Sequence, residues 1–222
     1  MHVLGWTQQP LRAAHRGRRS ALAKRTRELA TTASKIDDAG LARRLREHGD
    51  MIKEVEGDIL KSTARAIAHG IAPNDHFDHG LALSLREQWP AMAKDFRHWM
   101  HTHHAEPGGL WTWATPDGRR IVNLLTHAPS RSEKAHPGEA KLEFVNHALR
   151  ELHAEIVREK IESIALPRLA TGVGGLAWVD VKPLVQRHLG ELAIPVYVYT
   201  TYKRDVAANE GSAQRTRASS GT

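Results

Sequence analysis

Short apolar runs alternate with longer amphipathic runs along most of this chain, and this alternation limits its fold more than any other feature. The short runs resemble buried strands in length and composition, and the longer ones repeat apolar residues at helical spacing. Strands that alternate with helices form a mostly parallel sheet with helices on both faces. The predicted strands cover residues 52–60, 66–69, 110–114, 121–126, 161–166 and 194–201, and the predicted helices residues 80–89, 91–101, 142–157 and 178–189.

One pair of strands departs from the parallel pattern. Residues 110–114 and 121–126 flank an Asp117-Gly118 turn, and this dipeptide is typical of β-hairpins. These two strands are therefore predicted to be antiparallel, which makes the sheet mixed. The predicted fold class is α/β, with helices and sheet in three layers (α/β/α).

The positive charge of the 222-residue chain is concentrated at its beginning. The formal net charge is +7, but residues 1–50 contain 11 Lys and Arg against 5 Asp and Glu, a net +6, which leaves +1 for residues 51–222. We interpret residues 1–50 as a basic helical extension that either contacts nucleic acid weakly or is a solvated surface. The strand pattern begins at Met51, so an alternative is that translation starts there. A folded domain is expected over residues 51–204, followed by a disordered tail over residues 205–222.

The composition excludes several kinds of chemistry. The chain has no cysteine, so disulfides, thiolate metal sites and a cysteine nucleophile are excluded. No apolar run approaches the roughly 20 residues that span a bilayer, and we expect a cytoplasmic monomer without membrane contact. His98, His101, His103 and His104 cluster near the end of a predicted helix, beside a Pro-Gly-Gly turn, and are not expected to hold a metal ion. No metal and no cofactor is predicted.

The most informative segment runs from Ile164 to Trp178, IALPRLATGVGGLAW, where a buried strand leads through a glycine-rich loop into a helix. Such a loop presents backbone N–H groups to an anion, and the following helix adds its positive N-terminal end. It lacks the Gly-Lys-Ser/Thr ending of a P-loop. Gly172, Gly174 and Ala177 match the loosest dinucleotide fingerprint, but too little chain follows for the rest of a Rossmann sheet. The loop is therefore predicted to bind phosphate, and the alternative is a tight turn that needs glycine for its backbone alone.

Gly174 distinguishes these two interpretations of the loop. If the loop binds phosphate, it carries no core packing, and a side chain at Gly174 is expected to block the ligand without unfolding the protein. If Gly174 has a structural role through a positive φ, the same change is expected to cost stability.

Three further segments occur in the order found in macro domains, and over residues 51–202 the chain resembles that family. Residues 57–60, Gly-Asp-Ile-Leu, are similar to the motif after the first core strand. Residues 68–82, which include Asn74, Asp75 and the sequence His-Gly-Leu-Ala, resemble the loop that wraps the distal ribose. The glycine-rich loop at residues 171–175 resembles the second phosphate loop. The resemblance implies the three-layer macro-domain fold with a mixed, mostly parallel sheet.

The resemblance also implies a ligand, which is ADP-ribose, free or attached to a protein or nucleic acid. It assigns the carboxylate of Asp58 to the adenine amino group. The other residues implied to bind the ligand are Ile59, Asn74, Gly80, Leu81, Thr126, Ala170, Thr171, Gly172, Val173, Gly174, Gly175 and Leu176.

The subgroup that the chain resembles most contains single-domain bacterial proteins and hydrolases that remove terminal ADP-ribose from proteins or DNA. The sequence departs from its pattern at two positions, because His127 replaces a catalytic lysine and Gly174 replaces an aspartate of the second phosphate loop. Histidine suits general acid or base catalysis at neutral pH. The predicted catalytic residues are therefore His127, Asp75 and His79, with Lys134 in the adjoining loop.

Two functions remain open from the sequence. The first hypothesis is an enzyme that hydrolyses a mono-ADP-ribosylated target or ADP-ribose 1''-phosphate. The second is a reader module that binds ADP-ribose without turnover, and the missing lysine and aspartate keep this alternative open.

Overall fold

A computed structural model describes residues 51–103, 105–130 and 138–211. The predicted basic extension at residues 1–50, together with His104 and Lys134, lies outside the described residues. Within the described ranges, no helix has the length and apolar character that crossing a membrane requires.

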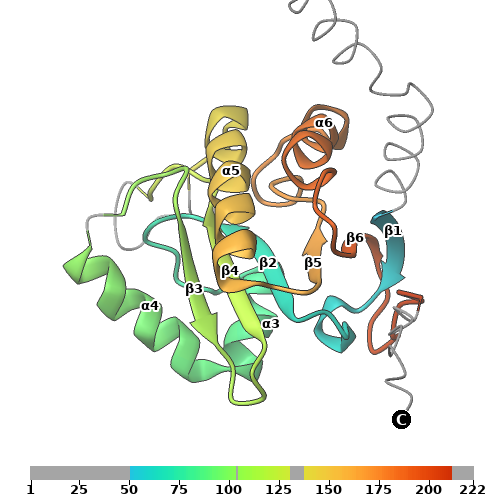
Figure 1. Ribbon diagram of the computed structural model, residues 1–222. Helices are drawn as coiled ribbons and strands as arrows, with labels where there is room; N and C mark the ends of the chain where they lie inside the picture. Colours follow the sequence, from blue (N-terminus) through green and yellow to red (C-terminus); the bar gives the residue numbers. More distant parts are fainter. Residues whose placement is uncertain (1–50, 104, 131–137, 212–222) are drawn as a thin grey trace, which may run out of the picture. The chain divides into compact units, whose positions relative to one another are not determined.

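The described residues build a six-stranded sheet in the order β1-β6-β5-β2-β4-β3 (Figure 1). Neighbouring strands are parallel except β3 and β4, which form the predicted antiparallel hairpin. Gly118 in the hairpin turn has a φ of +83°, which glycine adopts easily. The strands are β1 (Ile52–Gly57), β2 (Ala66–Ile71), β3 (Leu110–Ala114), β4 (Arg120–Leu125), β5 (Ile164–Pro167) and β6 (Val196–Tyr202).

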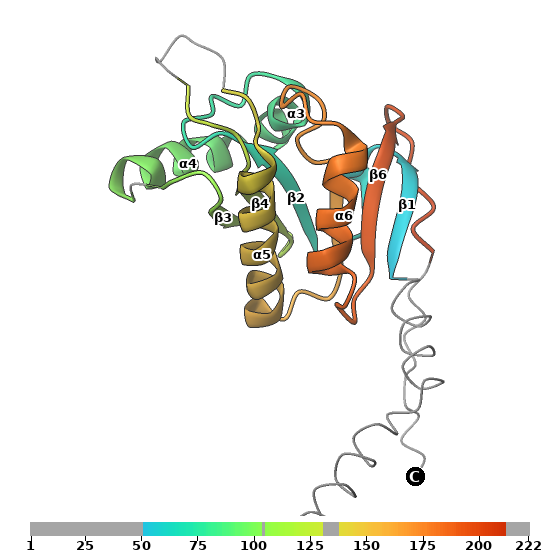
Figure 2. The ribbon, with the colours of Figure 1, turned by 90° about the horizontal axis from the view of Figure 1, so that it is seen from above.

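Helices cover both faces of the sheet (Figure 2). The core on one face contains side chains of α5 and α6, and the core on the other face contains side chains of α3 and α4. The helices are α3 (Gly80–Gln88), α4 (Pro90–Thr102), α5 (Leu142–Glu159) and α6 (Trp178–Leu189). The mixed, mostly parallel sheet between two helical layers confirms the predicted fold class.

The strands divide their side chains between the two cores. In β2, Ala66 and Ala68 face the core under α5 and α6, whereas Ile67 and Ile71 face the core under α3 and α4. Successive side chains of a strand point to opposite faces, so a strand buried on both faces must be apolar at nearly every position. This explains why the strands appear in the sequence as continuous apolar runs.

The first strand is shorter than predicted. It ends at Gly57, and Ile59 belongs to a short 3₁₀ helix (Ile59–Lys61) whose first turn is capped by the carboxylate of Asp58. Ile59 is buried, so its apolar character reflects core packing and not continuation of the strand.

The folded domain extends past its predicted end. Residues 205–211, which we call the C-terminal strap, contain Glu210, whose side chain is 6% exposed. The carboxylate of Glu210 accepts hydrogen bonds from Ser62, Thr63 and Tyr199. The predicted boundary at residue 204 and the predicted disorder of residues 205–211 are therefore wrong, because polar composition does not reveal a buried and fully paired carboxylate. Residues 212–222 lie outside the described part of the chain.

Candidate functional site

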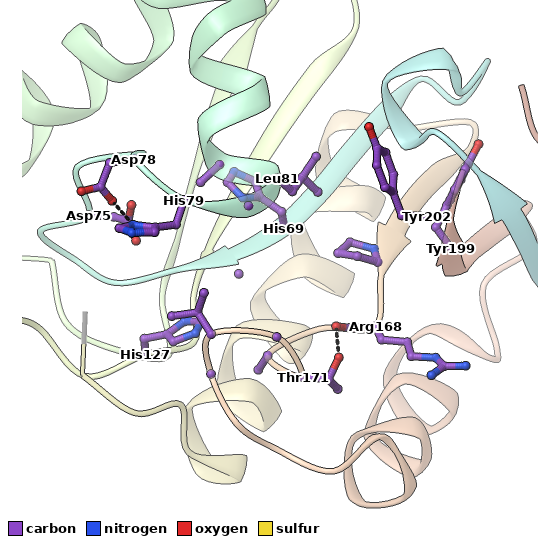
Figure 3. Close-up of a pocket in the computed structure, with 18 of the residues that line it drawn as sticks. His69, Asp75, Asp78, His79, Leu81, His127, Arg168, Thr171, Tyr199 and Tyr202 are labelled. Carbon is purple, nitrogen blue, oxygen red and sulfur yellow. Dashed lines mark hydrogen bonds and ion pairs between the residues drawn. The ribbon is translucent and has the colours of Figure 1, made fainter. Parts of the chain in front are cut away.

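A pocket of about 440 Å³ opens at the carboxyl ends of the parallel strands. Its walls come from the end of β2, the loop that leads into α3, the residue after β4, the loop after β5 and the end of β6 (Figure 3). Ligands bind at this edge of open α/β sheets, because the loops that leave neighbouring strands meet there. The volume falls within the usual range of small-molecule pockets, roughly 300–1,000 Å³.

The loop after β5 contributes a row of unpaired backbone N–H groups. Ala170 has a φ of +58°, and the loop is closed by hydrogen bonds from the Leu176 N–H to the Ala170 carbonyl oxygen at 3.0 Å and from the Gly175 N–H to the Gly172 carbonyl oxygen at 3.1 Å. Among the described residues, no acceptor pairs with the N–H groups of residues 171–174. These four residues line the pocket. Successive unpaired N–H groups around a cavity form an anion-binding site.

The start of α3 contributes donors on the opposite side of the pocket (Figure 3). The helix begins at Gly80, and His79 before it makes no side-chain cap. Gly80, Leu81 and Ala82 line the pocket, and the first N–H groups of a helix have no acceptor within the helix. The glycine-rich loop and the positive end of α3 therefore border one cavity, an arrangement that suits a diphosphate.

Gly174 is tightly packed, unlike Gly172 in the same loop. A Cβ atom at Gly174 would lie 2.5 Å from the Ala170 carbonyl oxygen, 2.8 Å from the Ala140 Cβ and 2.8 Å from Nε2 of His127. Gly174 has no positive φ, so crowding and not backbone conformation requires glycine there. The expectation that this position carries no core packing is therefore wrong. At Gly172, by contrast, a Cβ would meet no atom within 4 Å.

His127 follows β4, and its ring borders the pocket beside the glycine-rich loop (Figure 3). Its Nδ1 lies 2.9 Å from Oγ1 of Thr126. Burial lowers the pKa of His127 below its usual value of 6.5, although a backbone hydrogen bond with Ile71 and the charge of Asp75 act in the opposite direction. The imidazole is therefore neutral at neutral pH and can accept a proton.

His69, in the second half of β2, also lines the pocket and was not among the predicted site residues. It is buried, and its Nε2 lies 2.7 Å from Oδ1 of Asn123 in β4. Burial lowers the pKa of His69 to about 4, so this ring is also neutral. The signal that could have identified the pair is a polar residue, His69 or Asn123, among the apolar residues in the interior of each strand.

The loop between β2 and α3 places Asp75 and His79 at the pocket. The carboxylate of Asp75 accepts hydrogen bonds from the N–H groups of Phe77 at 2.7 Å and Ala72 at 3.4 Å, so it also holds the loop in shape. Nδ1 of His79 lies 2.6 Å from Oδ1 of Asp78. Burial acts to raise the pKa of Asp78, but the hydrogen bond and charge of His79 lower it overall.

Asp58, which the resemblance assigns to adenine, does not line the pocket. It is 5% exposed, and its two carboxylate oxygens accept hydrogen bonds from the N–H groups of Leu60 and Asp205 at 3.0 and 3.2 Å. A direct contact between Asp58 and a base stays a prediction.

Several other residues implied to bind the ligand also lie outside the pocket wall. Asn74 connects two loops through hydrogen bonds with the backbone of Ser130, and the hydroxyl of Thr126 supports His127. Ile59, Gly175 and Leu176 do not line the pocket either. The implied residues that do line it are Gly80, Leu81 and residues 170–174, together with the candidate catalytic residues His127, Asp75 and His79.

The far wall of the pocket contains aromatic residues that were not among the predicted site residues. Tyr199 and Tyr202 of β6 line the pocket, and Tyr202, the last residue of the strand, is 69% exposed. Arg168 lies between this wall and the glycine-rich loop (Figure 3). The sequence signal that could have identified Tyr202 is an aromatic residue at the last position of a strand.

The histidines of α4 do not form a site with other ligating groups. Within the described ranges, no three His, Asp or Glu side chains come together as metal ligands. The His103 ring instead stacks on Trp99, with ring centroids 5.5 Å apart.

The order of the strands and the two helical layers give the described domain the fold of macro domains. No family model matches the chain. It is similar to the DNA ADP-ribosyl glycohydrolase of Thermus aquaticus, at 27% identity in an alignment 155 residues long that covers 67% of this chain and 41% of that protein. It is also similar to a DNA ADP-ribosyl transferase-DNA ADP-ribosyl glycohydrolase fusion protein of Thermosipho africanus, at 26% identity in an alignment 166 residues long that covers 68% of this chain and 42% of that protein.

Among solved structures, the macrodomain of Thermus aquaticus DarG matches with a TM-score of 0.61 and 26% identity. The match covers 68% of this chain and 98% of that one. The matched region thus spans about two fifths of the length of these curated relatives and nearly the whole of the macrodomain structure.

Gly172→Glu tests the anion site directly. A carboxylate at this open position repels a diphosphate beside residues 171–174, so we expect ADP-ribose affinity to fall about tenfold or more, with unchanged stability. Ala177→Glu is the matched control, because Ala177 is exposed and lies outside the pocket. Calorimetric titration of both variants measures the effect, and equal affinities would show that the loop does not bind the diphosphate.

Gly174→Ala tests the packing of the loop. The added methyl overlaps the Ala170 carbonyl oxygen and the His127 ring, so the free energy of unfolding is expected to fall by about 1–3 kcal/mol. Gly172→Ala, with open space around its Cβ, is expected to change stability by less than about 0.5 kcal/mol. Urea unfolding of both variants measures the difference, and equal midpoints would contradict the close contact.

Proposed function

We propose that this domain binds ADP-ribose and hydrolyses the bond that joins the distal ribose to a modified DNA base. The row of unpaired N–H groups at residues 171–174, facing the first residues of α3 across the pocket, carries the proposal. Two sets of backbone donors on opposite walls suit two linked phosphates. Nucleotide diphosphates present that arrangement, with a sugar on each side.

Two observations support DNA as the carrier of the ADP-ribose. The similar curated proteins are named DNA ADP-ribosyl glycohydrolases. Residues 1–50 carry a net charge of +6, and cationic segments gain affinity from the phosphates of nucleic acid. A basic segment has no comparable general attraction for a protein that carries ADP-ribose.

The chemistry that we propose begins with a water molecule that attacks the anomeric carbon of the distal ribose. The neutral His127 ring accepts a proton from this water as the new C–O bond forms. The bond to the base breaks, its electron pair leaves with the base, and the base takes up a proton from solvent. The N–H groups of the loop hold the diphosphate, so that the anomeric carbon stays beside the ring.

Asp75 and His79 have supporting roles in this proposal. Asp75 is close enough to raise the pKa of His127, so its charge stabilises the imidazolium that forms during the reaction. His79 and its ion-pair partner Asp78 lie on the same side of the pocket as His127, where the target base would leave (Figure 3). A role for Lys134 remains a prediction from the sequence.

The direct test is incubation of the full chain with three substrates: a mono-ADP-ribosylated oligonucleotide, a mono-ADP-ribosylated protein and ADP-ribose 1''-phosphate. We expect release of ADP-ribose from the oligonucleotide at the highest kcat/KM, measured by chromatography. Release from the protein or the phosphate alone would assign the enzyme to another substrate class. Tight ADP-ribose binding without release from any substrate would make the domain a reader module.

The pH profile tests His127. As a general base the ring must be neutral, and burial lowers its pKa, so kcat/KM is expected to stay level at neutral pH and to fall only below pH 6.5. His127→Ala is expected to reduce kcat by about 100-fold or more and to remove this acidic limb. An unchanged acidic limb in the variant would assign the titration to another group.

A further inference from the structure

The C-terminal strap folds back beside the end of β1 and the 3₁₀ helix that follows it (Figure 1). Two sets of contacts hold it to the rest of the domain. The first is Asp58, whose N–H donates to the Val206 carbonyl oxygen at 2.7 Å and whose carboxylate accepts from the Asp205 N–H at 3.2 Å. A Cβ at Gly57 would lie 2.7 Å from that same carbonyl oxygen. The end of β1 is therefore shaped to receive the strap.

The second point is Glu210. Its Oε1 accepts hydrogen bonds from the hydroxyls of Ser62 at 2.5 Å and Tyr199 at 2.9 Å. Its Oε2 accepts from the N–H and the hydroxyl of Thr63 at 2.9 and 2.5 Å. No ion pair with Glu210 is found in the described part of the chain, so these four donors stabilise the buried carboxylate. Such a network is costly to leave partly unpaired.

Both points lie behind the aromatic wall of the pocket. Tyr199 and Tyr202 line the pocket, and Tyr199 donates directly to Glu210. The pairing of β5 with β6 ends at Tyr199, so beyond it β6 pairs with β1 alone, at Thr201 and Tyr202. That β1 pairing is also irregular, with a register shift between Val55 and Glu56. The last residues of β6 therefore depend on the end of β1, which the strap holds.

We propose that Glu210 and Asp58 are positioning residues, which hold Tyr199 and Tyr202 through the strap as the wall for the adenosine end of the ligand. The assignment of that end rests on the proposed function, because hydrolysis beside His127 leaves adenosine on the opposite side, where Figure 3 shows the two tyrosines. An exposed aromatic ring at the rim, as in Tyr202, suits stacking on a purine.

Glu210→Ala in the full chain is the test, with Asn209→Ala as the matched control, since Asn209 is the exposed neighbour of Glu210 in the strap. The Glu210→Ala protein is expected to melt cooperatively and to bind ADP-ribose about tenfold more weakly. Its KM should rise by the same factor, with kcat unchanged at saturation, because the wall is remote from His127. Asn209→Ala is expected to behave as the wild type.

A double-mutant cycle with Tyr202→Ala separates positioning from general destabilisation. If the strap acts through the wall, Glu210→Ala weakens binding little further once Tyr202 is already alanine. Full additivity of the two changes, or wild-type affinity in a folded Glu210→Ala protein, would overturn the proposal. If Glu210→Ala does not fold, Glu210→Gln, which keeps one carbonyl acceptor, is assayed in the same cycle with the same criteria.

The two proposals fail in different ways. A wild-type chain that does not bind ADP-ribose refutes the proposed function. A wild-type chain that binds it, with Glu210→Ala equal in affinity, refutes only the role of the strap.

Discussion

The contact between Gly174 and the ring of His127 is the constraint on which the pocket depends. The two residues follow β5 and β4, strands that are separated in the sheet by β2. Ala140 joins both, since its N–H donates to the Gly174 carbonyl oxygen at 3.3 Å and it forms a β-bridge with His127. The anion-binding loop and the imidazole are thus fixed relative to one another by packing before any ligand arrives.

The attraction of this pocket for an anion comes mainly from backbone dipoles. Burial lowers the pKa values of two pocket-facing rings, His69 and His127, and Arg168 is the one Lys or Arg side chain in the described wall. N–H groups held in a closed loop provide a positive potential without a mobile counter-charge, and they lose no side-chain entropy on binding.

The sequence predicted what depends on local pattern and missed what depends on distant contacts. Short apolar runs predicted the strands and helical spacing the helices, Asp117-Gly118 predicted the hairpin, and the glycine-rich loop indicated the phosphate site. The strap was missed because Glu210 pairs with Ser62, 148 residues earlier, and no periodicity records such a contact. The crowding at Gly174 was missed for the same reason, since Ala140 and His127 come from other parts of the chain.

The two departures from the pattern of the resembled hydrolases meet in one part of the pocket wall. A Cβ at position 174 would lie 2.8 Å from Nε2 of His127, but it would lie closer still, at 2.5 Å, to the Ala170 carbonyl oxygen. The backbone of the loop and the imidazole together therefore leave no room at 174 for a side chain such as the expected aspartate. The same exchange that removes an amine nucleophile introduces a buried, neutral proton acceptor at the pocket wall. For this reason the missing lysine and aspartate do not by themselves favour a reader over an enzyme, and the protonation state of His127 becomes the deciding property of the site.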